Sequence, residues 1–293
     1  MKDLILMQIA NCLSANVQKL MNPGLLEGKM GVAVFLYHYA RYSGRMTYSH
    51  FADNLIKEIL KSTSRLQISF SSGLSGIGWG IDHLLKEDFI KTNDDILKLL
   101  DNNIIRYIQL RADEDMLDGC IYLTFSRPEL LDDTLIQILS KQFSIFLSSG
   151  NHSLAVLNKL LVLSIHTPSQ QLHTWYDMLL NEAVNTKLYT RSDLMICKKL
   201  LELSHGKKDN KAWHKLHDSC TSILSMSNFQ TDHIDTVWQN MVFLSGSGIE
   251  ICDINRISLV VANILKDLSI NDMYLSCGLP AMGMNILLAT ELL

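Results

Sequence analysis

The sequence ISFSSGLSGIGWGIDHLL, at residues Ile68–Leu85, indicates how the whole chain is built. Gly73, Gly76, Gly78 and Gly80 fall within eight residues, and an apolar, helix-like tail follows them. Glycine in a helix interior costs about 0.5–1 kcal/mol relative to alanine, so its repeated use needs a steric reason. The stretch therefore predicts a helix whose backbone lies close to a neighbouring backbone or to a ligand.

Similar glycine-led apolar segments recur along the chain, each after an amphipathic segment with helical spacing of its apolar residues. The amphipathic segments lie at 4–20, 51–61, 93–111, 131–147, 171–184, 211–226 and 255–268. Their apolar partners lie at 24–41, 68–85, 117–125, 149–165, 237–252 and 275–293, and 192–204 takes the same place without a glycine. The sequence thus predicts seven helical hairpins at a spacing of roughly 40 residues, within the range of repeat arrays.

The two kinds of helix predict two layers. A helix that is apolar on most sides is buried, whereas an amphipathic helix faces solvent on one side. We therefore expect an all-α fold, an α/α toroid of about seven hairpins with inner and outer helix layers. The last segment is apolar and needs cover, so we expect it to close against the first pair. No linker-like segment divides the chain, which favours a single domain over residues 1–293.

Composition excludes several classes of protein. The net charge is −4 and no basic run occurs, so we expect no nucleic-acid partner. No window approaches the roughly 18 uncharged apolar residues of a membrane span, and no signal peptide is predicted. The six cysteines are dispersed without a Cys-x-x-Cys pair, so we expect free thiols and a cytoplasmic location.

Three segments carry a family resemblance. GLLEGKMGVAVFLYHYA (24–40), SSGLSGIGWGIDHLL (71–85) and LSCGLPAMGMNILL (275–288) resemble the repeated glycine motifs of lanthionine synthetase C-like proteins. The resemblance implies a toroid of seven outer and seven inner helices. It also implies a bacterial protein of lantibiotic biosynthesis, whose relatives add a cysteine thiol of a precursor peptide across a dehydrated serine or threonine. In those enzymes a central zinc ion holds the thiol as thiolate, because zinc lowers its pKa.

The zinc ligands of the family are not recognisable in this sequence. They are one cysteine in a WCxG-like motif and a Cys-His pair in a CHG motif. Here no cysteine follows a tryptophan and none precedes a histidine. The stretch expected to hold CHG is LSGSGIE (244–250), with Ser245 and Gly246 in place of the pair, and the GHG-like motif is also missing. We therefore expect no metal cofactor and assign no catalytic residue.

Four residues are predicted to bind substrate: Ser72, Trp79, Asp82 and Cys277. Ser72 lies among hydroxyls and free N–H groups at a helix start, which suit an anion or a peptide carboxylate, or ordinary helix capping, and Ser71 and Ser75 share this setting. Asp82 precedes His83, and the two would form an acid–base pair if both faced a cavity. Neighbours on a helix point about 100° apart, so hydrogen-bonded or solvated positions are the alternative.

The remaining candidates are weaker. Cys277 is either a thiol ligand or nucleophile, or a small buried hydrophobe; together with Cys120 and Cys252 it would form an unusual three-cysteine zinc site. His214 and His217 have a metal-compatible spacing, but a solvated helix face accounts for them and for the nearby His205. His152 is expected to cap its helix with Asn151 and Ser153.

These features predict a protein that binds or scaffolds a precursor peptide, or a partner modifying enzyme, without the usual zinc-dependent cyclase activity. Two alternatives remain. One is an enzyme that uses the central cavity for other chemistry, for example on carbohydrate or lipid, although the inner segments are poor in the paired carboxylates of sugar hydrolases. The other is a purely structural interaction protein.

Overall fold

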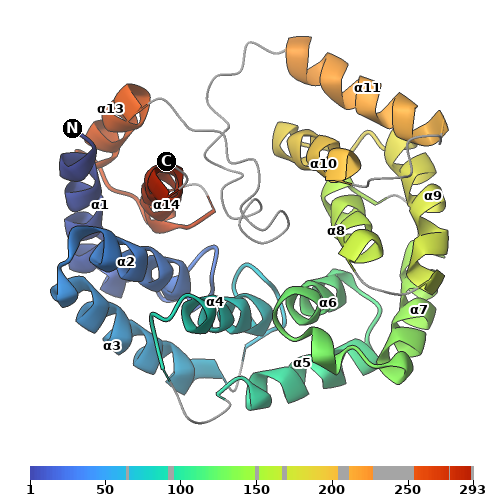
Figure 1. Cartoon of the computed structure of the whole chain (residues 1–293), viewed down its shortest axis with the longest axis horizontal. Coiled ribbons are helices and arrows are strands. Elements are labelled where there is room, and N and C mark those ends of the chain that lie inside the picture. Colours follow the sequence, from blue (N-terminus) through green and yellow to red (C-terminus); the bar gives the residue numbers. More distant parts are fainter. Residues whose placement is uncertain are drawn as a thin grey trace. The chain divides into compact units, whose positions relative to one another are not determined.

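All regular elements in the described part of the chain are helices (Figure 1). The computed structural model describes residues 1–63, 66–91, 96–148, 152–166, 170–203, 211–226, 254–276 and 278–291. The helices are α1 (Lys2–Asn16), α2 (Lys29–Ser43), α3 (Met46–Ser62), α4 (Leu74–Lys86), α5 (Lys98–Leu110), α6 (Glu114–Ser126), α7 (Asp133–Ser148), α8 (Leu154–His166), α9 (Gln170–Asn185), α10 (Arg191–Leu203), α11 (Lys211–Met226), α13 (Ile254–Ile264) and α14 (Leu279–Glu291). Short 3₁₀ turns lie at Val17–Lys19, Pro128–Leu130 and Asn271–Met273. The prediction of an all-α fold is confirmed.

The sequence placed most helices within a few residues of their observed bounds, with informative exceptions. Helix α2 begins at Lys29, not at Gly24, because residues 22–28 form a turn in which Lys29 N donates to Asn22 O over 2.9 Å. Helix α3 begins earlier than predicted, at Met46, since Gly44 in the left-handed region ends α2 and leaves a two-residue link. The predicted helix at 237–252 lies outside the described residues.

Burial separates the glycine-led helices from the amphipathic ones. In α2, 12 of 15 residues are buried, whereas in α3 only 4 of 17 are. In α8, 9 of 13 residues are buried, against 3 of 16 in α7. The apolar helices are therefore core elements, as the sequence predicted, and the amphipathic α3 packs along α2. None of the helices in the described residues is long and apolar enough to span a membrane.

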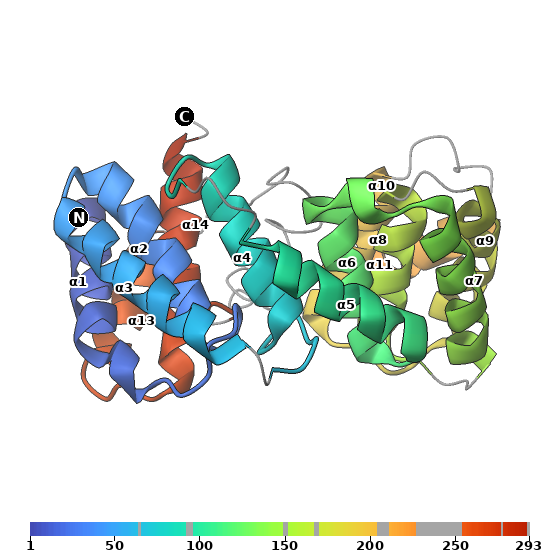
Figure 2. The same cartoon turned by 90° about the horizontal axis from the view of Figure 1, so that it is seen from below.

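The chain divides into two compact units. The first comprises Met1–Asn102 and His233–Leu293. In it α14, the last helix of the chain, lies beside α1 and α2 (Figures 1 and 2). The contact with α2 is tight, because a Cβ on Gly283 would lie 2.2 Å from the ring of Phe35. The last hairpin thus packs on the first, in agreement with the closure predicted from the sequence.

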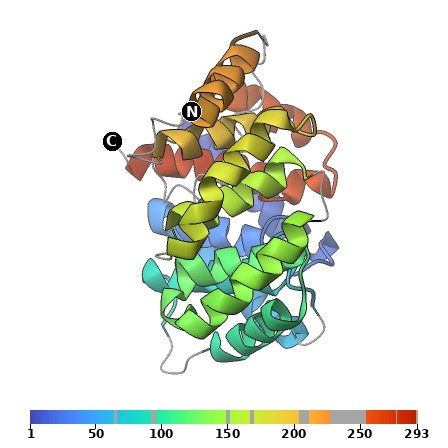
Figure 3. The same cartoon turned by 90° about the vertical axis from the view of Figure 1, so that its right-hand side faces the viewer.

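The second unit comprises Asn103–Asp232. In it α8 packs against α6 and α10, while α9 and α11 pack against each other and against α8 and α10 respectively (Figure 3). Lys159 of α8 lies 2.7 Å from Asp118 and 2.9 Å from Glu114, so one half-buried lysine joins α8 to α6. The interpretation of the chain as a single domain stays a prediction.

Candidate functional site

The loops before three glycine-led helices meet in the first unit. Leu26 N donates to Ser71 O over 2.9 Å, and Ser276 N donates to Leu26 O over 3.1 Å. The loops before α2, α4 and α14 are therefore joined by backbone hydrogen bonds. We call residues 24–28, 69–76 and 274–276 the motif rim. It unites the three segments that carry the family resemblance.

Glycine is required at the motif rim because backbones touch there. A Cβ on Gly76 would lie 2.0 Å from Phe70 O, and one on Gly24 would lie 2.3 Å from the Cα of Ser72. Both distances are far below any contact that real Cβ atoms make. The sequence left open whether the glycines admit a backbone or a ligand, and at these two positions the neighbour is backbone.

The serines around Gly73 do not cap α4. The residue that caps the helix is Gly73, and no side chain hydrogen-bonds to the first turn. Ser72 is half-buried on the motif rim, and the Ser75 hydroxyl is buried with no hydrogen-bond partner among the described residues. Helix capping, offered from the sequence as one role for these serines, is therefore wrong.

A second feature lies further along α2 and α4. Trp79 and His83 of α4 stack with ring centroids 5.0 Å apart and planes 7° from parallel. His83 stacks in turn on His38 of α2 at 5.2 Å, and Phe89 meets His38 edge-on at 4.7 Å. We call Trp79, His83, His38 and Phe89 the aromatic column. It fastens the later turns of two core helices and the segment after α4.

The two imidazoles at the centre of the column share a hydrogen bond. Nε2 of His38 and Nε2 of His83 lie 2.9 Å apart, so one ring donates and the other accepts. Burial lowers the pKa of His38 to about 3, helped by His83 and Arg41, and burial lowers the pKa of His83 to about 4 against the opposing pull of Glu87. Both rings are therefore neutral at pH 7 and act as hydrogen-bonding groups, not as cations.

Arg41 stacks on Phe89 at one end of the aromatic column. The guanidinium of Arg41 lies 3.6 Å from the centroid of the Phe89 ring and 2.9 Å from the carboxylate of Glu87. It also donates to the backbone carbonyl of Glu87. Planar guanidinium suits this combination of stacking and forked hydrogen bonding. The end of α4 is thus tied to α2 by one side chain.

The structure separates the predicted substrate-binding residues. Ser72 lies on the motif rim, whereas Trp79 is 7% exposed and belongs to the aromatic column. Asp82 lies further along α4 and forms an ion pair with Lys86 over 2.7 Å. Cys277 lies outside the described residues, although its neighbour Ser276 is on the motif rim. Substrate contact by these four residues stays a prediction.

Part of the aromatic column was not predicted from the sequence. Asp82 and His83 do not form an acid–base pair, because Asp82 bonds to Lys86 and His83 to His38. The partners His38 and Phe89 received no role from the sequence. A signal was present, since His38 is the single imidazole in the mostly apolar stretch 30–40, and Trp79 and His83 are four residues apart on one face.

The comparison with known families decides where this chain belongs. The family described as "Lanthionine synthetase C-like protein" matches residues 19–171, more than half of the 293 residues. The chain belongs to this family. The match covers α2, α4 and the first two segments of the motif rim, so the resemblance seen in the sequence is confirmed. No curated protein and no solved structure matches the chain.

The donors described in this lanthionine synthetase C-like chain do not fit a zinc ion. Among the described residues, no three His, Cys, Asp or Glu side chains are placed to hold a metal. Cys120 is fully buried, and burial, with a contribution from Asp118, raises its pKa well above the ordinary thiol value. A cysteine binds zinc as its thiolate, so this environment opposes ligation by Cys120. Cys252 and Cys277 lie outside the described residues.

The other candidates have structural partners. His217 stacks on Trp213 at 4.9 Å and lies 3.8 Å from Glu202. His152 stacks on Phe146 at 4.6 Å, and the Ser153 hydroxyl accepts from Val156 N in the first turn of α8. His205 and Asn151 lie outside the described residues.

Proposed function

We propose that this chain is a peptide-binding lanthionine synthetase C-like protein that does not carry out zinc-dependent cyclisation. One observation carries the proposal. The motif rim keeps glycines that leave no room for a Cβ, at Gly24 and Gly76, while Ser245 and Gly246 stand where the family has its Cys-His pair. The scaffold of the family is retained and its thiol-activating donors are replaced, which favours binding over cyclase chemistry.

The precursor peptide is the partner that family membership suggests. A peptide that binds across the motif rim would contact backbone groups and the half-buried Ser72. A sugar hydrolase is less well supported, because such enzymes use a pair of available carboxyl groups. Asp82 of α4 and Asp118 of α6 are instead held by Lys86 and Lys159. Peptides of this kind are made in the bacterial cytoplasm, and the free cysteines of the described residues suit that compartment.

Two measurements on purified protein test the proposal. The first is binding of a precursor peptide encoded beside this gene, in dehydrated form and with its cysteines free. We expect saturable binding, and thiol labelling followed by mass spectrometry should show no loss of peptide thiol beyond the rate without protein. The second is metal content, which we expect to be far below one zinc per chain.

The opposite results would overturn the proposal in separable ways. Thioether formation, or one zinc per chain that is lost in Cys252→Ala or Cys277→Ala, would show that a metal site exists. Cys12→Ala is the matched control, because Cys12 is a half-buried thiol on α1. Failure of the peptide to bind would reject the binding role and leave a structural one.

A further inference from the structure

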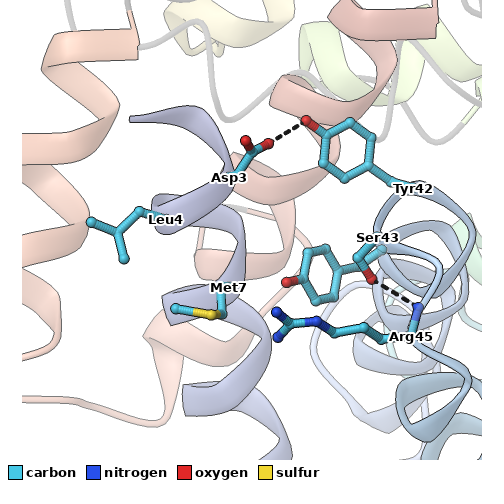
Figure 4. Close-up of a pocket in the computed structure, with 7 residues that line it drawn as sticks. Asp3, Leu4, Met7, Tyr42, Ser43 and Arg45 are labelled. Carbon is cyan, nitrogen blue, oxygen red and sulfur yellow. Dashed lines mark hydrogen bonds between the residues drawn. The ribbon is translucent and has the colours of Figure 1, made fainter.

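A pocket of about 550 Å³ lies in the first unit between α1 and the link from α2 to α3 (Figure 4). Leu4 and Met7 of α1 form one wall, and Tyr39 and Tyr42 of α2 form the other. Leu4 is 54% exposed and Tyr42 is 39% exposed, so apolar surface is left open to solvent at the mouth. The remaining lining residues are Asp3, Ser43 and Arg45.

Arg45 is held at the pocket by a short, fixed link. Gly44, with φ +69°, ends α2, and Met46 begins α3, so Arg45 has little backbone freedom. Its backbone N donates to the Ser43 hydroxyl and its carbonyl accepts from Tyr48 N. Figure 4 shows the guanidinium extending from this link toward Met7 on the opposite wall. The pocket therefore contains a cation whose backbone is fixed.

No ion pair involves Arg45 in the described residues, unlike Arg41 one turn earlier, which binds Glu87. Arg45 also stands at the N-cap of α3, where no side chain caps the helix. The free N–H groups of that helix end add positive potential to that of the guanidinium. The arginine end of the pocket thus favours an anion.

The single carboxylate of the pocket has a partner of its own. Asp3 accepts a hydrogen bond from the Tyr42 hydroxyl over 2.6 Å. Both Arg45 and Asp3 act on the pKa of Tyr39. Burial is the largest cause of its raised pKa, while Arg45 opposes the rise and Asp3 adds slightly to it. Arg45 is therefore the charge that a ligand is free to pair with.

We propose that this pocket binds a peptide segment that carries an acidic residue next to an apolar one. The carboxylate pairs with Arg45, and the apolar side chain lies against Leu4, Met7 and Tyr39. Guanidinium binds carboxylate through two parallel hydrogen bonds, which gives the contact direction as well as strength. The inference rests on the proposed peptide binding and assigns that function a second contact, away from the motif rim.

A charge-swap experiment tests the assignment. The probes are two fluorescein-labelled amidated peptides, GSLEFSG and GSLKFSG, whose binding is followed by fluorescence anisotropy. We expect the native chain to prefer the glutamate peptide, and Arg45→Glu to weaken its binding about tenfold while improving that of the lysine peptide. Leu4→Asn should weaken both peptides, because it removes apolar wall without touching the charge.

Controls keep the result interpretable. Arg45 and Leu4 are exposed, so both variants should melt at the native temperature, which circular dichroism checks. Arg106→Glu changes an exposed arginine on α5 and should leave both affinities unchanged. Equal affinities of native chain and Arg45→Glu for both peptides would overturn the assignment, as would absence of any binding. Either result leaves the proposed function to its own test with the precursor peptide.

Discussion

The two ends of helices α2 and α4 are held together in different ways. At their starts, on the motif rim, backbone meets backbone: Leu26 N bonds to Ser71 O, and Gly24 lies against the Cα of Ser72. At their ends the contact is made by rings, with His38 of α2 stacked on His83 of α4. The same pair of helices is therefore joined once by backbone geometry and once by side-chain chemistry.

The difference predicts which end tolerates change. A backbone contact at 2 Å from a would-be Cβ accepts only glycine, whatever the function of the protein. A ring contact depends on the shape and charge of the side chains. Substitution there therefore changes the free energy of unfolding, and its dependence on pH, by an amount that varies with the new side chain. The motif rim is thus the part that keeps family membership visible in the sequence, and the aromatic column is the part that is free to diverge.

The largest effect is expected on the motif rim. Gly76→Ala places a Cβ 2.0 Å from Phe70 O and 2.9 Å from the Leu25 Cβ, and a backbone carbonyl cannot rotate away as a side chain does. We expect a loss of about 3 kcal/mol or more in the free energy of unfolding, and Gly76→Leu should prevent folding. Urea denaturation followed by circular dichroism measures both.

Two other glycines serve as matched controls for that prediction. A Cβ on Gly80 meets only side-chain atoms, from Cγ to Cε of Met30, and one on Gly44 meets nothing within 4 Å but sits at φ +69°. Alanine should cost about 1 kcal/mol at either position, since Met30 can move and left-handed backbone is only mildly strained. If Gly76→Ala proved no worse than these two, the close-contact explanation of the motif would be wrong.

The second effect concerns the aromatic column and pH. The pKa values of His38 and His83 are lowered to about 3 and about 4, against about 6.5 in an unfolded chain. Between pH 6.5 and 4 the unfolded chain therefore binds protons that the folded chain does not, and stability falls as the pH falls. The loss is up to about 1.4 kcal/mol per pH unit for each histidine.

Urea denaturation at pH 7 and pH 5 measures this slope. His83→Gln should reduce the difference in unfolding free energy between the two pH values, because one of the two neutral rings is gone. His50→Gln is the control, since His50 is exposed on α3 and should leave the slope unchanged. A native chain equally stable at both pH values would contradict the neutral histidine pair.

Much of the fold was predictable because it follows from periodicity and glycine placement. Apolar residues at helical spacing identified the core helices. The structure agrees, because a far larger share of residues is buried in α2 than in the amphipathic α3. Helix starts were less predictable. The turn over residues 22–28 delays α2 to Lys29 through hydrogen bonds between loops that are far apart in the sequence. Such contacts carry no local signal.

The candidate site was harder to predict for the same reason. Trp79 and Asp82 stand in one motif, and nothing in their spacing indicates that Trp79 joins a column with His38 while Asp82 turns to Lys86. Pairing between helices depends on their rotation about their axes, which amphipathic pattern fixes only coarsely when the helix is apolar on most sides. His38, the residue that completes the pair, was therefore missed.

The smallest effect sharpens the account of the column itself. Arg41 stacks on Phe89 and pairs with Glu87, but its side chain is 42% exposed, so Arg41→Met should cost only about 0.5–1 kcal/mol. Because Arg41 also helps to lower the pKa of His38 to about 3, its removal should raise that pKa and shrink the loss of stability between pH 5 and pH 3, the range in which the folded ring begins to bind its proton. Arg106→Met, an exposed change on α5, should alter neither quantity. A loss of stability with an unchanged pH slope would show that Arg41 acts on the column through packing alone, and that the histidine pair stays neutral by burial without help from charge.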